Sequence, residues 1–352
     1  MTKEKVTLDK IASKLGITKV TVSKALKNQP GVSEALKKQI IELSNQMGYV
    51  TRKEKPIQTV YKLGLIVPKR FFLEIDDFYT KIFYYLNREC ALLHYTLNLY
   101  ILEPKEEDAL NYPLSFTQDQ SELSGLFIAG EIKSDYLKLL LNLPIPIVAI
   151  DFYKNNLRLD YIVSDNYRMG YFITNYLVEK GHHTIGFVGN PNYTSSVMDR
   201  YCGYFRALTQ HGLEIRKEWH IVNNDESGKY HFDFSLPDQL PSAFVCYCDM
   251  AAHILLSKLQ INGVRVPEDV SLISFDNTEI SQTMVPALTT MHIDRFEFAE
   301  KALKRMQWRL QHPDEEAQFV YVNSKLIERD SVKSLSDSPP LIPDPDYAIG
   351  ER

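Results

Sequence analysis

Residues 7–26 read TLDKIASKLGITKVTVSKAL and contain two short helical patterns joined by a glycine. The first pattern places its apolar residues on one face: Leu8, Ile11, Ala12 and Leu15. Thr7 is a candidate N-cap, Gly16 supplies the turn, and Thr18 can cap a second helix over residues 19–26. A third pattern follows Ser33. Two helices joined by a tight turn, with a third packed behind them, predict a small helix-turn-helix unit.

The outer face of the second helix carries no acidic residue. Its outward residues, with the residue that precedes the helix, are Thr18, Lys19, Val20, Thr21, Ser23, Lys24 and Lys27. In a helix-turn-helix unit the N-terminal part of the second helix enters the major groove. Lys19 suits guanine O6 and N7, Val20 suits a thymine methyl group, and the hydroxyls and other lysines can reach phosphates or bases. We therefore expect double-stranded DNA as partner, although similar helix pairs also occur in ordinary bundles.

The charge of the chain is divided unevenly. Residues 1–55 hold 12 Lys and Arg against 5 Asp and Glu, whereas the remaining residues hold 28 against 40. A basic head on an acidic body favours a polyanion partner for the head alone. There is no secretory signal pattern and no apolar run of about 18 residues, so we expect a cytoplasmic protein. The four cysteines are too few and scattered for a disulfide framework or a zinc site, and no cofactor or metal is expected.

From Leu63 onward, short apolar strands alternate with helical patterns. The strand candidates are GLIV, LNLYIL, GLFIAG, PIVAID, TIGFVG, AFVCYC and VSLISFD. This alternation predicts parallel sheets covered by helices on both faces, and about 270 residues are enough for two lobes. The predicted fold is a small all-α helix-turn-helix head followed by an α/β body of two doubly wound parallel-sheet lobes.

Both the head and the body of the sequence resemble one protein family. The head VTLDKIASKLGITKVTVSKAL…PGVSEALKKQIIELSNQMGYV is similar to the DNA-binding head of the LacI/GalR family of bacterial transcription regulators. The body resembles that family in GHHTIGFVGNP, DRYCGYFRAL and GVRVPEDVSLISFDNTEISQTMVPALTTMHID. The resemblance covers residues 6–331 and implies the two-lobed fold of periplasmic sugar-binding proteins. It also implies a homodimer on a pseudo-palindromic operator, with a small effector between the lobes.

The resemblance, with the patterns above, divides the chain into four parts. We expect a head over residues 1–50, a linker over 51–61, the two-lobed body over 62–331 and a disordered tail over 332–352. Within the body, the N-lobe should comprise about 62–161 with 291–322, and the C-lobe about 162–290 with 323–331.

Three residues of this chain match the effector-binding positions of the family. They are Arg200, three positions before Gly203, Asp151 at the end of PIVAID, and Asp276 after VSLISF. Carboxylates accept hydrogen bonds from sugar hydroxyls, and an arginine offers a planar fork of donors. Each carboxylate also stands at the carboxyl end of a strand, where open α/β sheets bind ligands. Salt bridges between the lobes without a ligand are the alternative interpretation.

The chain departs from the family at several neighbouring positions. Cys248 and Asp249 stand where the family usually has Asn-Asp, Asn277 replaces a second acid, and His292 or Ile293 replaces a polar residue after LTT. Cysteine is a poor substitute for an amide in recognising hydroxyls, so sugars are only the default effector. Phe71 and Phe72 follow the first strand and either stack on a ligand ring or belong to the core.

The linker departs from the family as well. Relatives continue after the third helix with a hinge helix whose Leu wedges into the minor groove, but this chain has Pro56 and no Leu between Tyr49 and Leu63. Proline removes a backbone donor and disfavours helix at the preceding residue. We expect an extended basic arm in which Arg52, Lys53 and Lys55 contact DNA.

These features together predict a transcription regulator, a repressor, without enzymatic activity. One alternative is a sugar-binding protein with a vestigial head, which the intact pattern of residues 7–47 opposes. The other is an enzyme that uses Asp151, Asp276 and Arg200 for acid–base work, but neither a nucleophile nor a metal-ligand set accompanies them.

Overall fold

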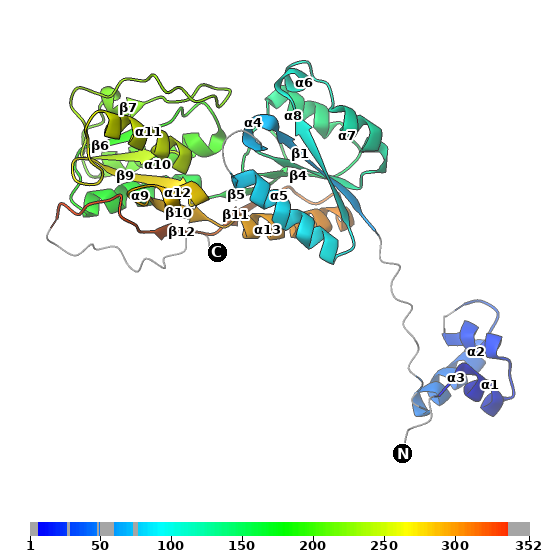
Figure 1. The fold of residues 1–352 in the computed structure, drawn as a ribbon. Helices are drawn as coiled ribbons and strands as arrows, with labels where there is room; N and C mark the ends of the chain where they lie inside the picture. Colours follow the sequence, from blue (N-terminus) through cyan, green and yellow to red (C-terminus); the bar gives the residue numbers. More distant parts are fainter. Residues whose placement is uncertain (1–5, 27–28, 48, 50–59, 73–76, 337–352) are drawn as a thin grey trace. The chain divides into compact units, whose positions relative to one another are not determined.

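The computed structural model describes residues 6–26, 29–47, 49, 60–72 and 77–336 and divides the chain into two compact units. The first unit is Met1–Thr59 and the second is Val60–Arg352. Figure 1 shows the helices and strands of both units. Each unit has its own hydrophobic core.

The head is built from three helices, α1 (Leu8–Leu15), α2 (Lys19–Leu26) and α3 (Glu34–Gln46). The Thr7 hydroxyl accepts a hydrogen bond from Lys10 N, and Gly16 ends α1 in the left-handed conformation with φ 63°. The Thr18 hydroxyl accepts a hydrogen bond from Thr21 N at 3.2 Å, so it satisfies one free donor of the first turn of α2. The core of the head consists of Ile11, Ala12, Val22, Ala25 and Ile40.

The N-lobe contains a six-stranded sheet in the order β11-β5-β4-β3-β1-β2, and all its strands are parallel. The strands are β1 (Lys62–Pro68), β2 (Thr96–Leu102), β3 (Gly125–Ala129), β4 (Ile147–Ile150), β5 (Asp160–Ser164) and β11 (Phe319–Val322). The helices of this lobe are α4 (Lys69–Phe72), α5 (Phe78–Leu92), α6 (Pro104–Asp108), α7 (Leu114–Asp119), α8 (Ser134–Leu141) and α13 (Arg295–Gln311). Strands β3, β4 and β5 are buried throughout, which explains their nearly continuous apolar sequence.

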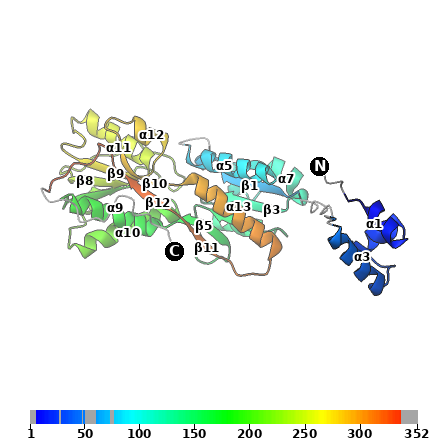
Figure 2. The same ribbon diagram turned by 90° about the horizontal axis from the view of Figure 1, so that it is seen from below.

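The C-lobe repeats this architecture with a second six-stranded sheet, in the order β12-β10-β9-β8-β6-β7. Its strands are β6 (Ile185–Val188), β7 (His220–Ile221), β8 (Ala243–Cys246), β9 (Ser271–Asp276), β10 (Thr289–Ile293) and β12 (Ser324–Ile327), and only β12 runs antiparallel to its neighbour. The helices are α9 (Asn166–Glu179), α10 (Ser195–Gln210), α11 (Asp249–Ile261) and α12 (Glu279–Thr283). Figure 2 shows the two lobes from below, with α13 along the N-lobe.

The chain passes between the lobes three times, after β5, after β10 and between β11 and β12. Strand β5 extends to Ser164 and β10 to Ile293, so the first two crossings lie three residues later than the boundaries at 161 and 290. Both strands continue until an aspartate begins the next helix: Asp165 caps α9 and Asp294 caps α13.

The start of the expected disordered tail is packed against the C-lobe. Lys333 N donates to the Ser271 hydroxyl at 3.0 Å, and its carbonyl lies 3.0 Å from His182 Nε2. Leu335 N donates to Lys180 O. The prediction of disorder was therefore wrong for residues 332–336, because partners distant in sequence satisfy their backbone groups; residues 337–352 lie outside the described part of the chain.

The lobes also contact each other through side chains. Glu131, which follows β3 of the N-lobe, accepts hydrogen bonds from both Ser195 N and Ser195 Oγ at 2.8 Å. Lys81 of α5 forms an ion pair of 3.2 Å with Glu279 of α12. These contacts hold the lobes together around the space between them. No helix within the described ranges is long and apolar enough to cross a membrane.

Candidate functional site

The predicted DNA-contact face of α2 is accessible in the head. Thr18, Lys19, Val20 and Lys24 are exposed, and Thr21 and Ser23 are partly buried. Val20 is 62% exposed, a large value for an apolar side chain that the core of the head does not use. A partner surface is a physical reason to leave it uncovered.

One feature of this face could not be read from the second helix alone. Lys19 Nζ forms an ion pair of 2.9 Å with Asp9 of α1. Both side chains are more than half exposed, so the pair is weak and can exchange for a DNA contact. Four other predicted DNA contacts, Lys27, Arg52, Lys53 and Lys55, lie outside the described residues.

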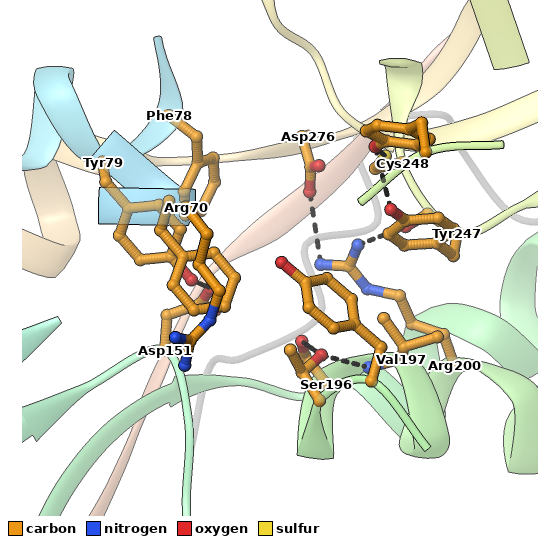
Figure 3. Close-up of a pocket in the computed structure, with 14 residues that line it drawn as sticks. Arg70, Phe78, Tyr79, Asp151, Ser196, Val197, Arg200, Tyr247, Cys248 and Asp276 are labelled. Atoms are coloured by element: carbon orange, nitrogen blue, oxygen red, sulfur yellow. Dashed lines mark hydrogen bonds and ion pairs between the residues drawn. The ribbon is translucent and has the colours of Figure 1, made fainter. Parts of the chain in front are cut away.

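The body contains a pocket between the lobes, which we call the interlobe pocket (Figure 3). It encloses an empty volume of about 560 Å³, part of which is open to solvent. Phe71, Tyr79 and Asp151 line it from the N-lobe, and Arg200 and Asp276 line it from the C-lobe. The two lobes therefore share this site.

Asp151 stands directly after β4 and Asp276 is the last residue of β9, and both have left-handed backbone geometry. Their φ angles are 65° and 101°. Residues other than glycine rarely adopt such angles, and the strain typically costs about 1–3 kcal/mol. Both carboxylates are buried. Strain of this kind concentrates at functional sites, where it fixes the direction of a side chain.

Arg200 is the buried cation of the pocket. Its Nη2 forms an ion pair of 3.2 Å with Asp276 Oδ1, and its Nε donates to Asn166 Oδ1 at 2.8 Å. Its guanidinium lies 4.5 Å from the centre of the Phe275 ring. This arrangement fixes the planar fork of donors at the C-lobe wall of the pocket.

Two glycines let α9 and α10 approach closely enough to position Arg200. A Cβ atom on Gly203 would lie 2.1 Å from Tyr167 O, and one on Gly170 would lie 2.2 Å from Arg200 O. Any larger residue would force the two helices apart. The bond from Arg200 to Asn166, at the start of α9, depends on this contact.

Asp151 is the least satisfied polar group of the pocket. Tyr79 OH donates to its Oδ2 at 2.7 Å, whereas its buried Oδ1 has no partner among the described groups. Burial raises the pKa of Asp151 to about 7, although the nearby Arg200 charge and the Tyr79 hydrogen bond oppose the rise. Burial likewise raises the pKa of Asp276, against the charges of Arg200 and Arg295. The pocket therefore offers an acceptor that a ligand donor can satisfy.

Of the predicted effector contacts, five line the interlobe pocket: Phe71, Asp151, Arg200, Cys248 and Asp276. The other three, Phe72, Asp249 and His292, do not line it. Phe72 packs edge-on against Phe83 with ring centres 6.0 Å apart. His292 Nδ1 lies 3.1 Å from Asn277 Nδ2.

Asp249 departs most clearly from its expected role as a ligand contact. Its carboxylate accepts hydrogen bonds from the hydroxyls of Ser274, Thr278 and Thr290 and from Thr278 N. With both oxygens engaged and 1% of its surface exposed, it joins α11 to β9, β10 and the loop after β9. No ligand is needed to satisfy it.

The pocket also contains residues that the sequence did not indicate: Arg70, Phe78, Tyr79, Tyr193, Thr194, Ser196, Val197, Tyr230 and Tyr247. Tyr247 OH donates to Tyr230 OH at 2.8 Å, and Tyr230 OH lies 3.3 Å from Cys248 Sγ. Tyr247 could have been inferred from its place at the end of β8. Tyr230 could not, because residues 223–242 form no helix or strand and show no period.

Two family models match the chain. One, described as bacterial regulatory proteins of the lacI family, matches residues 7–52, and the other, a periplasmic binding protein-like domain, matches residues 174–332. The HTH-type transcriptional repressor PurR of Pasteurella multocida is 27% identical over 336 residues, with 93% of this chain and 99% of the relative covered. PurR of Glaesserella parasuis is also 27% identical, with 94% and 99% covered.

The chain thus combines a lacI-family helix-turn-helix head with a periplasmic binding protein-like body, the domain composition of the LacI/GalR family of bacterial transcription regulators. Solved structures of LacI-family regulators share its fold. The CelR–cellobiose complex has a TM-score of 0.66 at 19% identity and covers 93% of this chain and 100% of its own. An Enterococcus faecium regulator with bound ribose has a TM-score of 0.65 at 22% identity and covers 78% of this chain and 100% of its own. The lacI-family match of the head, with the PurR relatives that align over nearly the full length, makes the chain a DNA-binding transcription regulator.

Proposed function

We propose that this LacI/GalR-family chain is a repressor that binds a pseudo-palindromic operator as a homodimer and takes a sugar or sugar derivative into the interlobe pocket. The observation that carries the proposal is the pairing of an accessible helix-turn-helix face with a polar pocket shared by two lobes. Relatives named as repressors, and family structures with bound ribose or cellobiose, support it.

In this proposal three charged residues of the interlobe pocket, Asp151, Arg200 and Asp276, divide the recognition of the effector. Asp151 Oδ1 and the Asp276 carboxylate accept hydrogen bonds from effector hydroxyls, and Arg200 donates to an effector oxygen. Phe71 and Tyr193, whose rings lie 5.7 Å apart across the lobes, contact the apolar face of the effector ring. Cys248, Tyr230 and Tyr247 replace the amide wall usual in the family, which favours an effector with fewer hydroxyls on that side.

Effector control follows from the position of the pocket between the lobes. A ligand that bonds Asp151 on one lobe and Arg200 on the other stabilises the closed arrangement over the open one. Only this difference in affinity can shift the population of the two states. In a dimer, lobe closure changes the spacing of the two heads and hence the affinity for the operator. We further propose that the protein acts in the cytoplasm and has no enzymatic activity.

The test is a mobility-shift experiment on genomic DNA fragments with the full chain. Specific retention that weakens steeply with salt is the expected result, because each phosphate contact releases counterions. The retained fragments are then titrated with sugars and sugar phosphates selected by thermal shift. Arg200→Lys, which keeps the charge beside Asp276 but loses the planar fork, should blunt the effector response and leave effector-free binding unchanged. Retention of random and genomic DNA alike would contradict the regulator function.

A further inference from the structure

A second cavity lies beside the first crossing between the lobes, and we call it the hinge cavity. Its wall is formed by the end of β5, the start of α9, one residue of α10, strand β11 and the loop after β4. Its empty volume is about 760 Å³, including space open to solvent. No residue of this wall lines the interlobe pocket.

Aromatic rings dominate one side of the hinge cavity. They belong to Tyr153, Tyr167, Phe319 and Tyr321. Phe319 and Tyr321, two residues apart on β11, point to the same face of the strand and are 49% and 46% exposed. Tyr167 is 40% exposed. Exposed aromatic side chains grouped around a hollow are typical of a binding surface.

The charged groups that line the hinge cavity are all acidic. Asp165 and Asp199 are lining residues, and no lysine, arginine or histidine occurs among the described residues of the wall. Arg168 lies 3.9 Å from Asp165 on the exposed side, a long and solvent-screened pair. Burial raises the pKa of Asp199 and the Asp165 charge adds to the rise, whereas the Tyr153 hydrogen bond and the Arg200 charge oppose it.

A buried hydroxyl in the wall also lacks a partner. Ser164 is 3% exposed, and its Oγ has no hydrogen-bond partner among the described groups. Buried hydroxyls normally have one, so this position is an independent sign of an absent ligand or water. Aromatic faces, two carboxylates and a free hydroxyl are thus gathered in one hollow.

We propose that the hinge cavity binds a small organic ammonium cation, with the charge held by Asp165 and Asp199 and the apolar frame by the aromatic rings. The negative faces of aromatic rings attract cations, with typical contributions of about 0.5–2 kcal/mol for each contact. A neutral ligand of equal shape lacks this attraction as well as the pairing with the carboxylates. An anion is repelled by both.

One side chain of the hinge cavity, that of Asn166, is bonded to a residue of the interlobe pocket. Asn166 lines the hinge cavity, accepts a hydrogen bond from Arg200 Nε at 2.8 Å and donates to Ser164 O at 3.2 Å. Tyr153 OH of the N-lobe bonds Asp199 of the C-lobe at 2.9 Å, so a cation here also contacts both lobes. The cation and the interlobe ligand therefore stabilise the same lobe arrangement and should raise each other's affinity. Cation binding itself does not depend on the function proposed above.

The experiment uses titration calorimetry of the full chain with choline and with 3,3-dimethyl-1-butanol, which has nearly the same shape without the charge. Choline should bind in the millimolar range or tighter, and the neutral alcohol at least about tenfold more weakly. Equal affinities, or no heat of binding with millimolar choline, would overturn the proposal.

Variants locate the binding. Tyr321→Leu removes one ring, and Asp199→Asn removes one charge but keeps an acceptor for Tyr153; each should weaken choline binding by about 3- to 30-fold. Tyr321→Phe keeps the ring and should restore the affinity, which separates the loss of the ring from a folding defect. Phe71→Leu, which removes a ring of the interlobe pocket, should leave choline binding unchanged. If Phe71→Leu weakens choline binding and Tyr321→Leu does not, the cation sits in the interlobe pocket and the proposal is wrong. If a variant loses operator binding but still binds choline, the result concerns the regulator function and not the cation site.

Discussion

Glu131 of the N-lobe accepts two hydrogen bonds from Ser195, the first residue of α10 in the C-lobe. Lys154 pairs with the other oxygen of the same carboxylate. Glu131 is thus bonded to both lobes through Ser195, which stands in sequence between the pocket residues Thr194 and Ser196. Helix α10 is also the helix that carries Arg200. The closed arrangement of the lobes depends on this contact more than on the pair of Lys81 and Glu279, in which the glutamate is largely exposed.

Replacing Glu131 should therefore weaken lobe closure. In Glu131→Gln the charge-assisted character of the Ser195 bonds is lost, at a cost of about 1–2 kcal/mol, which corresponds to roughly 5- to 30-fold in the affinity of an interlobe ligand. Calorimetry with the effector found by the thermal-shift screen measures this. The matched control is Glu122→Gln, which removes an exposed partner of Lys62 far from the crossings. Equal losses in both variants would mean that Glu131 has no special part in closure.

Lys19 should contribute to the choice of operator sequence. Lys19→Ala should cost about 1–3 kcal/mol on the operator and relax preference at one base position, whereas Lys24→Ala should weaken all sequences alike. Asp9→Ala frees Lys19 from its ion pair and should strengthen DNA binding slightly. Quantitative mobility shifts on operator and random DNA measure all three. If Lys19→Ala lowers the affinity for operator and random DNA by the same factor, Lys19 does not read a base.

The buried Asp151 should make stability depend on pH in a defined direction. Its folded-state pKa of about 7 is above the ordinary value of 3.8, so the folded protein holds a proton that the unfolded chain releases. This contribution favours the folded state below about pH 4 and is lost as the pH rises to about 7. Asp151→Asn has no titrating group at this position. Its free energy of unfolding should therefore rise relative to that of the wild type, by roughly 2–4 kcal/mol between about pH 4 and about pH 7.

Urea unfolding of both proteins at pH 4.5, 6 and 7.5 follows the difference in the free energy of unfolding. The groups that face Asp151 are Tyr79, Arg200, Asp276 and Glu131, and all are unchanged in the variant. A constant difference at the three pH values contradicts the raised pKa.

Cys248 should be a poor N-cap for α11. Its Sγ accepts a hydrogen bond from Ala251 N at 3.4 Å, and sulfur is a weak acceptor. Cys248→Ser places a strong acceptor there and should stabilise the protein by about 1 kcal/mol in thermal unfolding. Cys202→Ser is the control, because that exposed cysteine lies within α10 and caps nothing. If both serine variants unfold at the wild-type temperature, the cysteine N-cap of α11 does not lower the stability of the protein.

Local sequence determined the head and the alternation of the body. The caps Thr7 and Thr18 and the glycine at position 16 act within one turn of the chain, so the three helices could be predicted. The resemblance to the LacI/GalR family indicated Asp151 and Asp276, and their positions at the carboxyl ends of strands in the two sheets agree with where open α/β sheets bind ligands.

Only the tertiary structure decided which polar residues remain available to a ligand. Asp249 looked like a ligand contact from its position after β8, but three hydroxyls from distant segments satisfy its carboxylate. Asp151, which is also buried, keeps one oxygen without a partner among the residues that the structure describes. Burial and hydrogen bonding across 25 to 41 residues of sequence leave no periodic signal, because each depends on how separate segments pack. The same holds for Asn166, whose bond to Arg200 joins the two cavities only once α9 and α10 touch through Gly170 and Gly203.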